Sequence, residues 1–93
     1  MNEMQRKAVT VINATGLHAR PASMFVQAAG GYQCDIDVIK GDSRINAKSI
    51  MGIMSAGIAQ GTDIIIETSG DDEIDALDKL VSLVESGFGE ETR

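Results

Sequence analysis

The apolar residues of this chain switch repeatedly between the period of two that marks a β-strand and the period near 3.6 that marks an α-helix. Within 93 residues, strand-like spacing covers 6–12, 34–38, 44–46 and 63–68. Helix-like spacing covers 19–29, 50–57 and 71–88. The predicted order is therefore strand, helix, two strands, short helix, strand, helix. Because segments this short must share one core, we expect a single domain over 1–93, with its core at about 4–88 and a tail at 89–93.

The two longer helical segments carry their apolar residues on one face, which predicts two packed layers. The first begins near Pro21, ends at Gly30 and Gly31, and has an apolar face of Ala19, Ala22, Phe25, Val26 and Ala29. For the last, we expect Ser69 or Gly70 as the cap and an inward stripe of Ile74, Leu77, Val81, Val84 and Phe88. The fold class is α+β, with helices on one face of a mostly antiparallel sheet and the other face open.

The net charge and the composition argue against several classes of partner and binding site. The formal net charge of −6 repels phosphate backbones and argues against nucleic acid as a direct partner. Cys34 is the only cysteine, so no internal disulfide forms, and no companions at metal-ligand spacing surround it or the single histidine. No apolar run reaches the roughly 18 residues of a membrane helix, and the first residues do not resemble a signal peptide. We expect a cytoplasmic protein without metal, cofactor or membrane insertion.

The stretch TGLHARPAS holds the only histidine and the only proline of the chain. It places His18 at or just before a helix N-terminus, where unpaired N–H groups and a partial positive charge favour an anion such as phosphate. Arg20 is close enough to direct its guanidinium at whatever His18 carries. These features suit a phosphoryl acceptor, although by pattern alone a surface or capping histidine is the commoner case.

Ser49 precedes the short apolar helix and is predicted to be its N-cap. A phosphate on Ser49 would add negative charge where a helix N-terminus tolerates it, with Lys48 available as its partner. A structural cap and a regulatory phosphorylation site are both consistent with this serine. On the helix itself, Ile53 and Met54 are expected in the core, while a two-turn helix leaves Ile50 and Met51 exposed as an adaptable docking patch.

The motifs GLHARPAS (Gly16–Ser23) and KSIMGIMSAGIAQG (Lys48–Gly61) together resemble the HPr family, the histidine-containing phosphocarrier proteins of the phosphoenolpyruvate-dependent sugar phosphotransferase system. The element order and the length match over essentially the whole chain. The resemblance implies an open-faced β-sandwich of the βαββαβα type, with a four-stranded antiparallel sheet and three helices on one face. It also implies a carrier of phosphoryl groups that is not itself an enzyme.

The resemblance assigns roles to individual residues. His18 would accept a phosphoryl group at Nδ1 from phospho-enzyme I and pass it to the EIIA domain of a sugar permease, and Arg20 would stabilise the phosphorylated ring. Ser49 matches the serine that an ATP-dependent HPr kinase/phosphorylase modifies, and the modified form would be a corepressor for a catabolite-control transcription factor. The implied partner-binding residues are Ala19, Arg20, Ser23, Lys48, Ile50, Met51 and Met54.

Other interpretations remain open. A regulatory module would act mainly through phosphorylation of Ser49 and binding to a transcription factor, without transfer through His18. A small-ligand-binding α+β domain would instead show a saturable metabolite site. Other HPr-like paralogues serve nitrogen regulation, a role that GLHARPAS alone does not exclude, whereas KSIMGIMS around Ser49 favours the sugar branch. In each case we expect a monomer.

Overall fold

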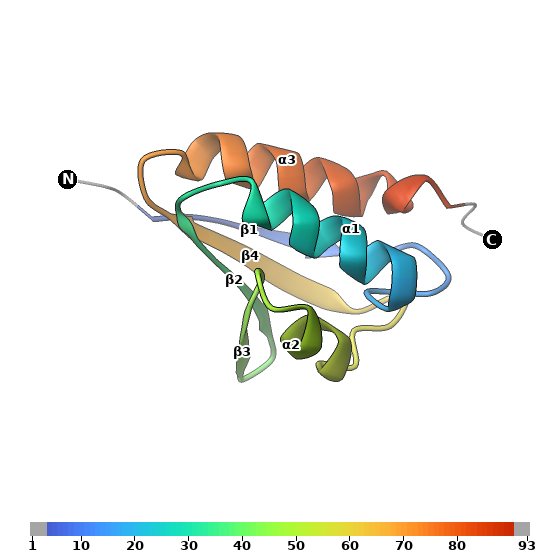
Figure 1. Cartoon of the computed structure of the whole chain (residues 1–93). Helices are drawn as coiled ribbons and strands as arrows, with labels where there is room; N and C mark the ends of the chain where they lie inside the picture. The colour runs from blue at the N-terminus through green and yellow to red at the C-terminus, as the bar shows by residue number, and fades with distance from the viewer. Residues whose placement is uncertain (1–3, 91–93) are drawn as a thin grey trace.

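The computed structural model describes residues 4–90, and its four strands form one antiparallel sheet (Figure 1). The strands are β1 (Gln5–Thr10), β2 (Asp35–Lys40), β3 (Ser43–Asn46) and β4 (Asp63–Ser69). Their order across the sheet is β1-β4-β2-β3, so β4 pairs with both β1 and β2. The predicted antiparallel sheet is confirmed.

Three helices and one short 3-10 turn complete the fold. These are α1 (Ala19–Gly30), α2 (Ile50–Ser55), α3 (Glu73–Glu85) and the 3-10 turn η1 (Gly87–Gly89). Figure 1 shows α1 and α3 side by side along one face of the sheet, with α2 beside β3. The predicted α+β class, with its helices on one face, is confirmed.

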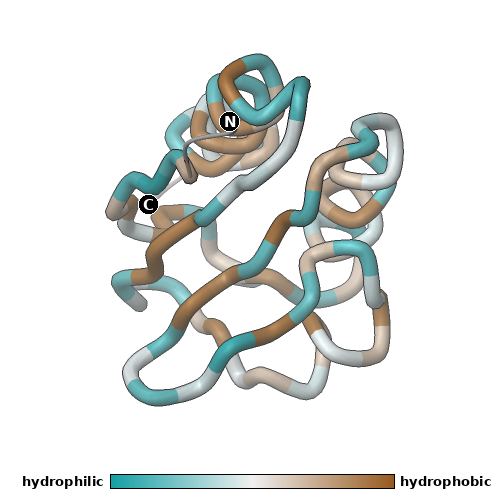
Figure 2. Tube along the Cα trace, turned by 90° about the vertical axis from the view of Figure 1, so that its left-hand side faces the viewer, coloured by the Kyte–Doolittle hydropathy of each residue, from teal (hydrophilic) through white to brown (hydrophobic). Residues whose placement is uncertain are grey.

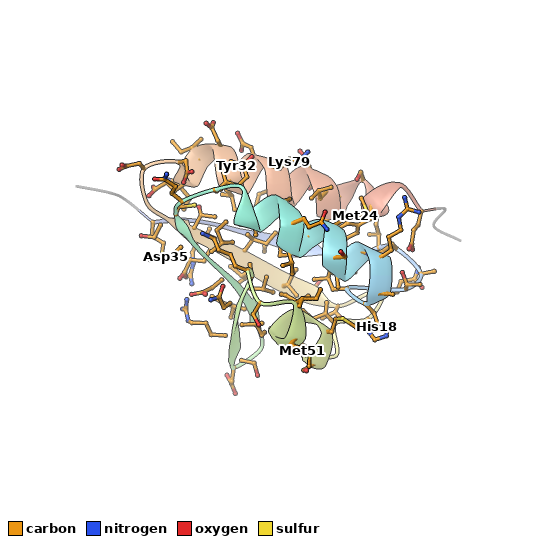
Figure 3. All side chains as sticks on the ribbon, viewed as in Figure 1. His18, Met24, Tyr32, Asp35, Met51 and Lys79 are labelled. Atoms are coloured by element: carbon orange, nitrogen blue, oxygen red, sulfur yellow. The ribbon has the colours of Figure 1, made fainter. Side chains whose placement is uncertain are left out.

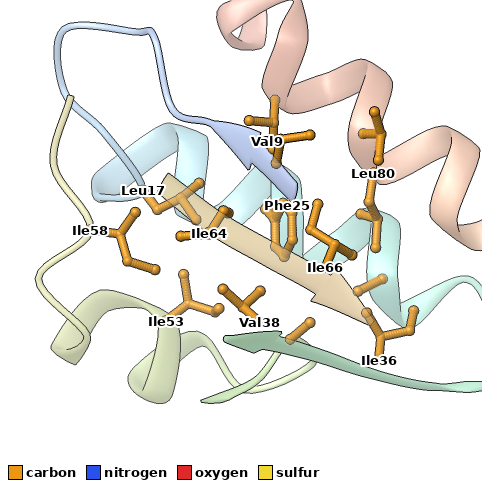
Figure 4. Close-up of a cluster of buried hydrophobic side chains, with 14 of the residues drawn as sticks. Val9, Leu17, Phe25, Ile36, Val38, Ile53, Ile58, Ile64, Ile66 and Leu80 are labelled. Atoms are coloured by element: carbon orange, nitrogen blue, oxygen red, sulfur yellow. The ribbon is translucent and has the colours of Figure 1, made fainter. Parts of the chain in front are cut away.

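The core lies between the sheet and the helices. Figure 2 shows hydrophobic and hydrophilic residues alternating along the strands, as expected when successive side chains point to opposite faces. The inward residues of the sheet meet Phe25 of α1 and Leu80 of α3, and the three most central of them are Val38, Ile64 and Ile66 (Figure 4). Each fully buried aliphatic or aromatic side chain of this kind contributes about 2 kcal/mol through removal of apolar surface from water.

The same core extends under the histidine loop. Leu17, Ile53 and Ile58 are buried there and lie close together in Figure 4. Leu17 immediately precedes His18, and Ile53 belongs to α2. The loop before α1 is therefore packed onto the segment that contains α2.

The position of α2 is fixed at both ends. At the start, the Ser49 hydroxyl accepts a hydrogen bond from the backbone N–H of Gly52 at 3.1 Å, so the predicted N-cap is confirmed. At the end, Lys40 Nζ of β2 donates to the carbonyls of Ala56 and Gly57 at 3.0 and 3.1 Å. A cation at this position also complements the negative end of the helix.

The start of α3 differs from the prediction. The N-cap is Asp72 rather than Ser69 or Gly70, and its carboxylate does not cap the helix. It accepts instead from the backbone N–H groups of Gln33 and Cys34 at 2.8 and 2.9 Å, which joins α3 to the start of β2. Glu73 takes over the role of a reciprocal cap by accepting from the N–H of Gly70 at 2.9 Å.

The inward face of α3 was also predicted only in part. Val81, Val84 and Phe88 are buried, but Ile74 is 61% exposed and Leu77 only half-buried. Ala76 and Leu80 occupy inward positions that the predicted stripe omits. The inward face differs because Glu73, a charged residue, takes its first position and is only 6% exposed. Its carboxylate also accepts a hydrogen bond from Gln5 Nε2 at 3.1 Å.

The opposite face of the sheet carries charged side chains rather than a helix, within residues 4–90. Glu67 on β4 accepts from Arg6 at 2.8 Å and from Arg44 at 2.6 Å, and Arg44 also contacts Asp37 at 3.0 Å. These contacts cross all four strands. The predicted sheet face without helices is therefore present, and ion pairs link its strands.

Candidate functional site

His18 is exposed at the N-cap of α1, with an extended backbone at φ −141° and ψ 153°. Its side chain makes no capping hydrogen bond. Figure 3 shows the ring at the edge of the molecule, directed away from the core. The imidazole is thus not used to cap the helix, so of the two commoner cases the structure excludes the capping histidine and leaves an exposed one.

The turn before His18 is built around Gly16. Gly16 has φ +65°, and a Cβ atom there would lie 2.3 Å from the carbonyl oxygen of Ile58. Asn13 closes the turn, because its backbone carbonyl accepts from Gly16 N at 3.1 Å and its Nδ2 donates to Gly16 O at 2.9 Å. Leu17 N then donates to Ile58 O at 2.9 Å. The glycine lets the turn touch the segment after α2, and this contact orients His18 outwards.

Ala19 has an unusual backbone conformation. Its φ is +53°, in the left-handed region, where a residue with a Cβ atom costs about 1–2 kcal/mol. The prediction that Ala19 belongs to the inward face of the helix is wrong, since it is exposed. The neighbouring Pro21 is buried and helps to hold the strained segment. Strain of this kind is concentrated at functional sites, and here it lies between His18 and Arg20.

The start of α1 is suited to an anion. Unpaired N–H groups lie at this end, and the first turn of the helix contains no acidic residue that would neutralise them. Arg20 is exposed within the same turn, and Ser23 one turn later is half-buried and accepts from Gln27 Nε2 at 3.4 Å. Helix amides and one guanidinium are therefore available near His18, as the sequence predicts.

The predicted docking patch lies on α2. Met51 is 72% exposed and Ile50 37%, whereas Ile53 is fully buried and Met54 half-buried against the core. His18 and Met54 line one shallow hollow of about 340 Å³ together with Leu17 and Ile58. Figure 3 shows His18 and Met51 on the same side of the molecule. The structure thus brings the histidine and the exposed part of α2 onto one continuous surface.

Lys48 is placed differently from the expectation that it could pair with a phosphate on Ser49. Its ammonium group donates to the backbone carbonyl of Tyr32, just after α1, at 2.8 Å. The lysine is half-buried in this position. In this conformation Lys48 ties the start of α2 to the end of α1 rather than facing the Ser49 hydroxyl.

The sequence analysis missed a polar cluster next to the histidine loop. The hydroxyl of Thr15 donates to the Glu90 carboxylate, with distances of 2.8 and 3.0 Å to its two oxygens, and Asn13 Nδ2 lies 3.3 Å from Oε1. Glu90 falls in the predicted tail, and 75 residues separate it from Thr15. No local periodicity could indicate a contact across that separation.

Glu90 also lies near the arginine of the site. Arg20 and Glu90 line a hollow of about 280 Å³ with Pro21, Met24 and Phe88. Hydrogen bonds from Thr15 and Asn13, together with the charge of Arg20, lower the pKa of Glu90 against the opposing effect of burial. The carboxylate is therefore charged at neutral pH.

Two further features limit the chemistry. Burial and the neighbouring Asp72 raise the pKa of the Cys34 thiol to about 11, so Cys34 stays protonated and packs as an apolar residue. Across residues 4–90, no three His, Cys, Asp or Glu side chains gather at a position where they could hold a metal ion. In the same range, no helix has the length and apolar character needed to cross a bilayer.

Comparison with known proteins agrees with this geometry. The family model described as "PTS HPr component phosphorylation site" matches residues 5–86. The phosphocarrier protein HPr of Neisseria meningitidis serogroup A is 44% identical over 94% of this chain and 98% of its own length. The HPr-like protein Crh of Bacillus subtilis is 43% identical over 88% and 96%. The crystal structure of HPr-C-His from Thermoanaerobacter tengcongensis superimposes with a TM-score of 0.92 at 49% identity, covering 94% and 98%.

Proposed function

The chain belongs to the HPr family of phosphocarrier proteins, and we propose that it carries a phosphoryl group on Nδ1 of His18. The donor in this proposal is phospho-enzyme I, and the acceptor is the EIIA domain of a sugar permease. The observation that carries the proposal is the exposed His18 ring, which makes no capping bond at a helix N-terminus that lacks an acidic residue. Family membership also supports the cytoplasmic location that the sequence predicts.

Within this chain, only the imidazole of His18 takes part in the bond changes of the proposed phosphoryl transfer. In the tautomer that carries its proton on Nε2, the lone pair of His18 Nδ1 attacks the phosphorus atom of the donor. An N–P bond forms at Nδ1, and the bond between phosphorus and the donor atom of enzyme I breaks, with the electron pair remaining on the donor. The proton on Nε2 stays in place. Transfer to EIIA repeats the exchange with the chain as donor.

The surroundings of His18 stabilise the phosphorylated form. The N–H groups at the start of α1 and the guanidinium of Arg20 are the donors in position to face the new dianion. Around His18, residues 4–90 form shallow hollows rather than a deep cleft. We therefore assign most of the transition-state stabilisation to the donor and acceptor proteins, which is consistent with a carrier that is not an enzyme.

The partner-binding surface in this proposal surrounds the histidine. It combines the start of α1 with α2 and comprises the exposed Ala19, Arg20, Ile50 and Met51 and the half-buried Ser23, Lys48 and Met54. A small, convex, partly apolar surface suits transient complexes with two different partners. Because the same surface must enter each partner in turn, we propose that the chain acts as a monomer.

The test is phosphorylation by enzyme I and phosphoenolpyruvate, with wild type, His18→Ala and Ser49→Ala compared. Wild type and Ser49→Ala should take up one acid-labile phosphoryl group each, and His18→Ala none. Acid-labile label on His18→Ala would refute the assignment. Thermal unfolding of all three variants shows whether a negative result reflects a lost fold.

A second role is proposed for Ser49. The serine caps α2 next to the exposed Ile50 and Met51, so a phosphate there would change the charge of the docking surface. We infer that a HPr kinase/phosphorylase acts on Ser49 and that a catabolite-control transcription factor recognises the product. The protein described as "Crh, the Bacillus subtilis Catabolite Repression HPr" is 42% identical to this chain, which supports regulation as an alternative main output. Phosphorylation of Ser49 without any transfer through His18 would favour that alternative.

A further inference from the structure

The fold brings the carboxylate of Glu90, at the end of the described residues, into contact with the loop that leads to the histidine. We propose that Glu90 keeps phosphorylation of His18 reversible, by placing a negative charge beside Arg20 that opposes the phosphoryl dianion. This inference rests on the proposed carrier function of His18. A carrier must release its phosphoryl group to an acceptor, so a site that bound the dianion too strongly would fail.

The position of the carboxylate is well determined by its hydrogen bonds. The Thr15 hydroxyl lies 2.8 and 3.0 Å from its two oxygens, and Asn13 Nδ2 adds a longer contact at 3.3 Å. Asn13 is fully buried and also bonds to both backbone groups of Gly16. Glu90 is thereby held against the turn that leads directly to His18.

The charge acts chiefly through Arg20. Both side chains line one hollow together with Met24 and Phe88, and the charge of Arg20 helps to lower the pKa of Glu90. Yet no ion pair joins Arg20 to Glu90 among the contacts of residues 4–90. The guanidinium is therefore free to turn toward a phosphoryl group, but it does so in the field of a nearby carboxylate. Arg20 and Glu90 thus act on the dianion with opposite signs.

The expected effect is moderate and depends on salt. Glu90 is only half-buried, so solvent and ions screen its interaction with the dianion. Replacing the carboxylate by a neutral amide should shift the transfer equilibrium with phospho-enzyme I toward the phosphorylated chain. We expect a change of about twofold to tenfold at low ionic strength, which should shrink toward zero near 1 M salt.

The experiment measures the phosphorylated fraction of the chain at equilibrium with enzyme I, at low and high salt. Glu90→Gln removes the charge but keeps an oxygen that can accept from Thr15. Glu85→Gln is the matched control, because Glu85 is an exposed glutamate on α3 whose removal changes the net charge equally. Glu90→Gln should raise the phosphorylated fraction in a salt-dependent way, and Glu85→Gln should not.

Several results would overturn the inference. These are a Glu90→Gln variant that behaves like wild type, an effect that persists at high salt, or an equal effect of Glu85→Gln. Thr15→Val weakens the hold on the carboxylate and leaves its charge on the chain, so it should raise the phosphorylated fraction by less than Glu90→Gln does. A larger increase for Thr15→Val than for Glu90→Gln would contradict the charge explanation. If wild type takes up no phosphoryl group at all, the proposed function fails instead.

Discussion

At the scale of single residues, the orientation of His18 depends on what its neighbours lack. Gly16 lacks a Cβ atom, and the first turn of α1 lacks an acid. The cap at Ser49 could be predicted from sequence because it depends on residues within one turn, whereas the outward orientation of His18 also depends on the contact of its turn with Ile58. The left-handed Ala19 and the contact of Glu90 with Thr15 could not, because neither follows from a local propensity.

Gly16 offers the sharpest test at this scale. In Gly16→Ala, the new Cβ would lie 2.3 Å from Ile58 O and 2.8 Å from Ala59 Cα, in addition to the cost of the positive φ. We expect the free energy of unfolding in urea to fall by about 2–4 kcal/mol. Gly41→Ala is the control, because Gly41 has φ +57° but nothing within 4 Å of the added atom. Its loss should be about 1 kcal/mol, and equal losses would contradict the steric argument.

At the scale of elements, most of the boundaries were predictable and one helix face was not. The first strand was predicted at 6–12 and spans Gln5–Thr10, although Val11 still bonds to Thr62 and Gly61. Apolar and polar residues alternate along a strand with one exposed face, so the sequence indicates such a strand clearly. The inward face of α3 was misjudged because the buried Glu73 accepts a hydrogen bond from Gln5, which is 68 residues away in the sequence, as well as from the nearby Gly70.

Helix α2 is the element on which the proposed regulation through Ser49 can be tested. Ser49→Asp retains a good N-cap while adding a negative charge next to Ile50 and Met51, and Ser49→Asn caps equally well without charge. We expect Ser49→Asp to slow phosphoryl transfer from enzyme I about tenfold or more, through weaker docking, with Ser49→Asn close to wild type. Stopped-flow or quench-flow transfer rates give the comparison. Equal rates for both variants would remove the proposed switch.

The open face of the sheet predicts how the protein responds to acid. Hydrogen bonds from Arg44 and Arg6 lower the pKa of Glu67 below its ordinary value of 4.5, against the effect of burial. A lowered pKa in the folded state means that the carboxylate stabilises the fold above pH 4.5 and that this contribution is lost as the pH falls through the folded-state value.

Glu67→Gln measures that contribution. The variant should lower the free energy of unfolding by about 1 kcal/mol at pH 7, and its stability should depend less on pH below 4.5 than that of wild type. Urea titrations between pH 7 and pH 3 provide the data. The exposed Glu85→Gln should follow wild type throughout. A Glu67→Gln curve parallel to wild type would show that the ion pairs of this face do not contribute.

At the scale of the whole molecule, the fold separates two tasks. The core between the sheet and the helices supplies most of the buried apolar contacts, while the exposed His18, Ile50 and Met51 lie outside that core. Short loops and a small core leave little room for a catalytic cleft. This arrangement is consistent with the proposed relay, in which His18 is presented to other proteins.

The central claim is that this surface carries a phosphoryl group on one nitrogen of His18. The most direct measurement is NMR of the wild-type chain after incubation with enzyme I and phosphoenolpyruvate, observing phosphorus and the ring nitrogens of a ¹⁵N-labelled sample together. The account predicts a single phosphorus signal coupled to Nδ1 of His18, with the rest of the fold unchanged. A phosphoryl group on any other residue, or a ring that stays unmodified while enzyme I is active, would contradict it.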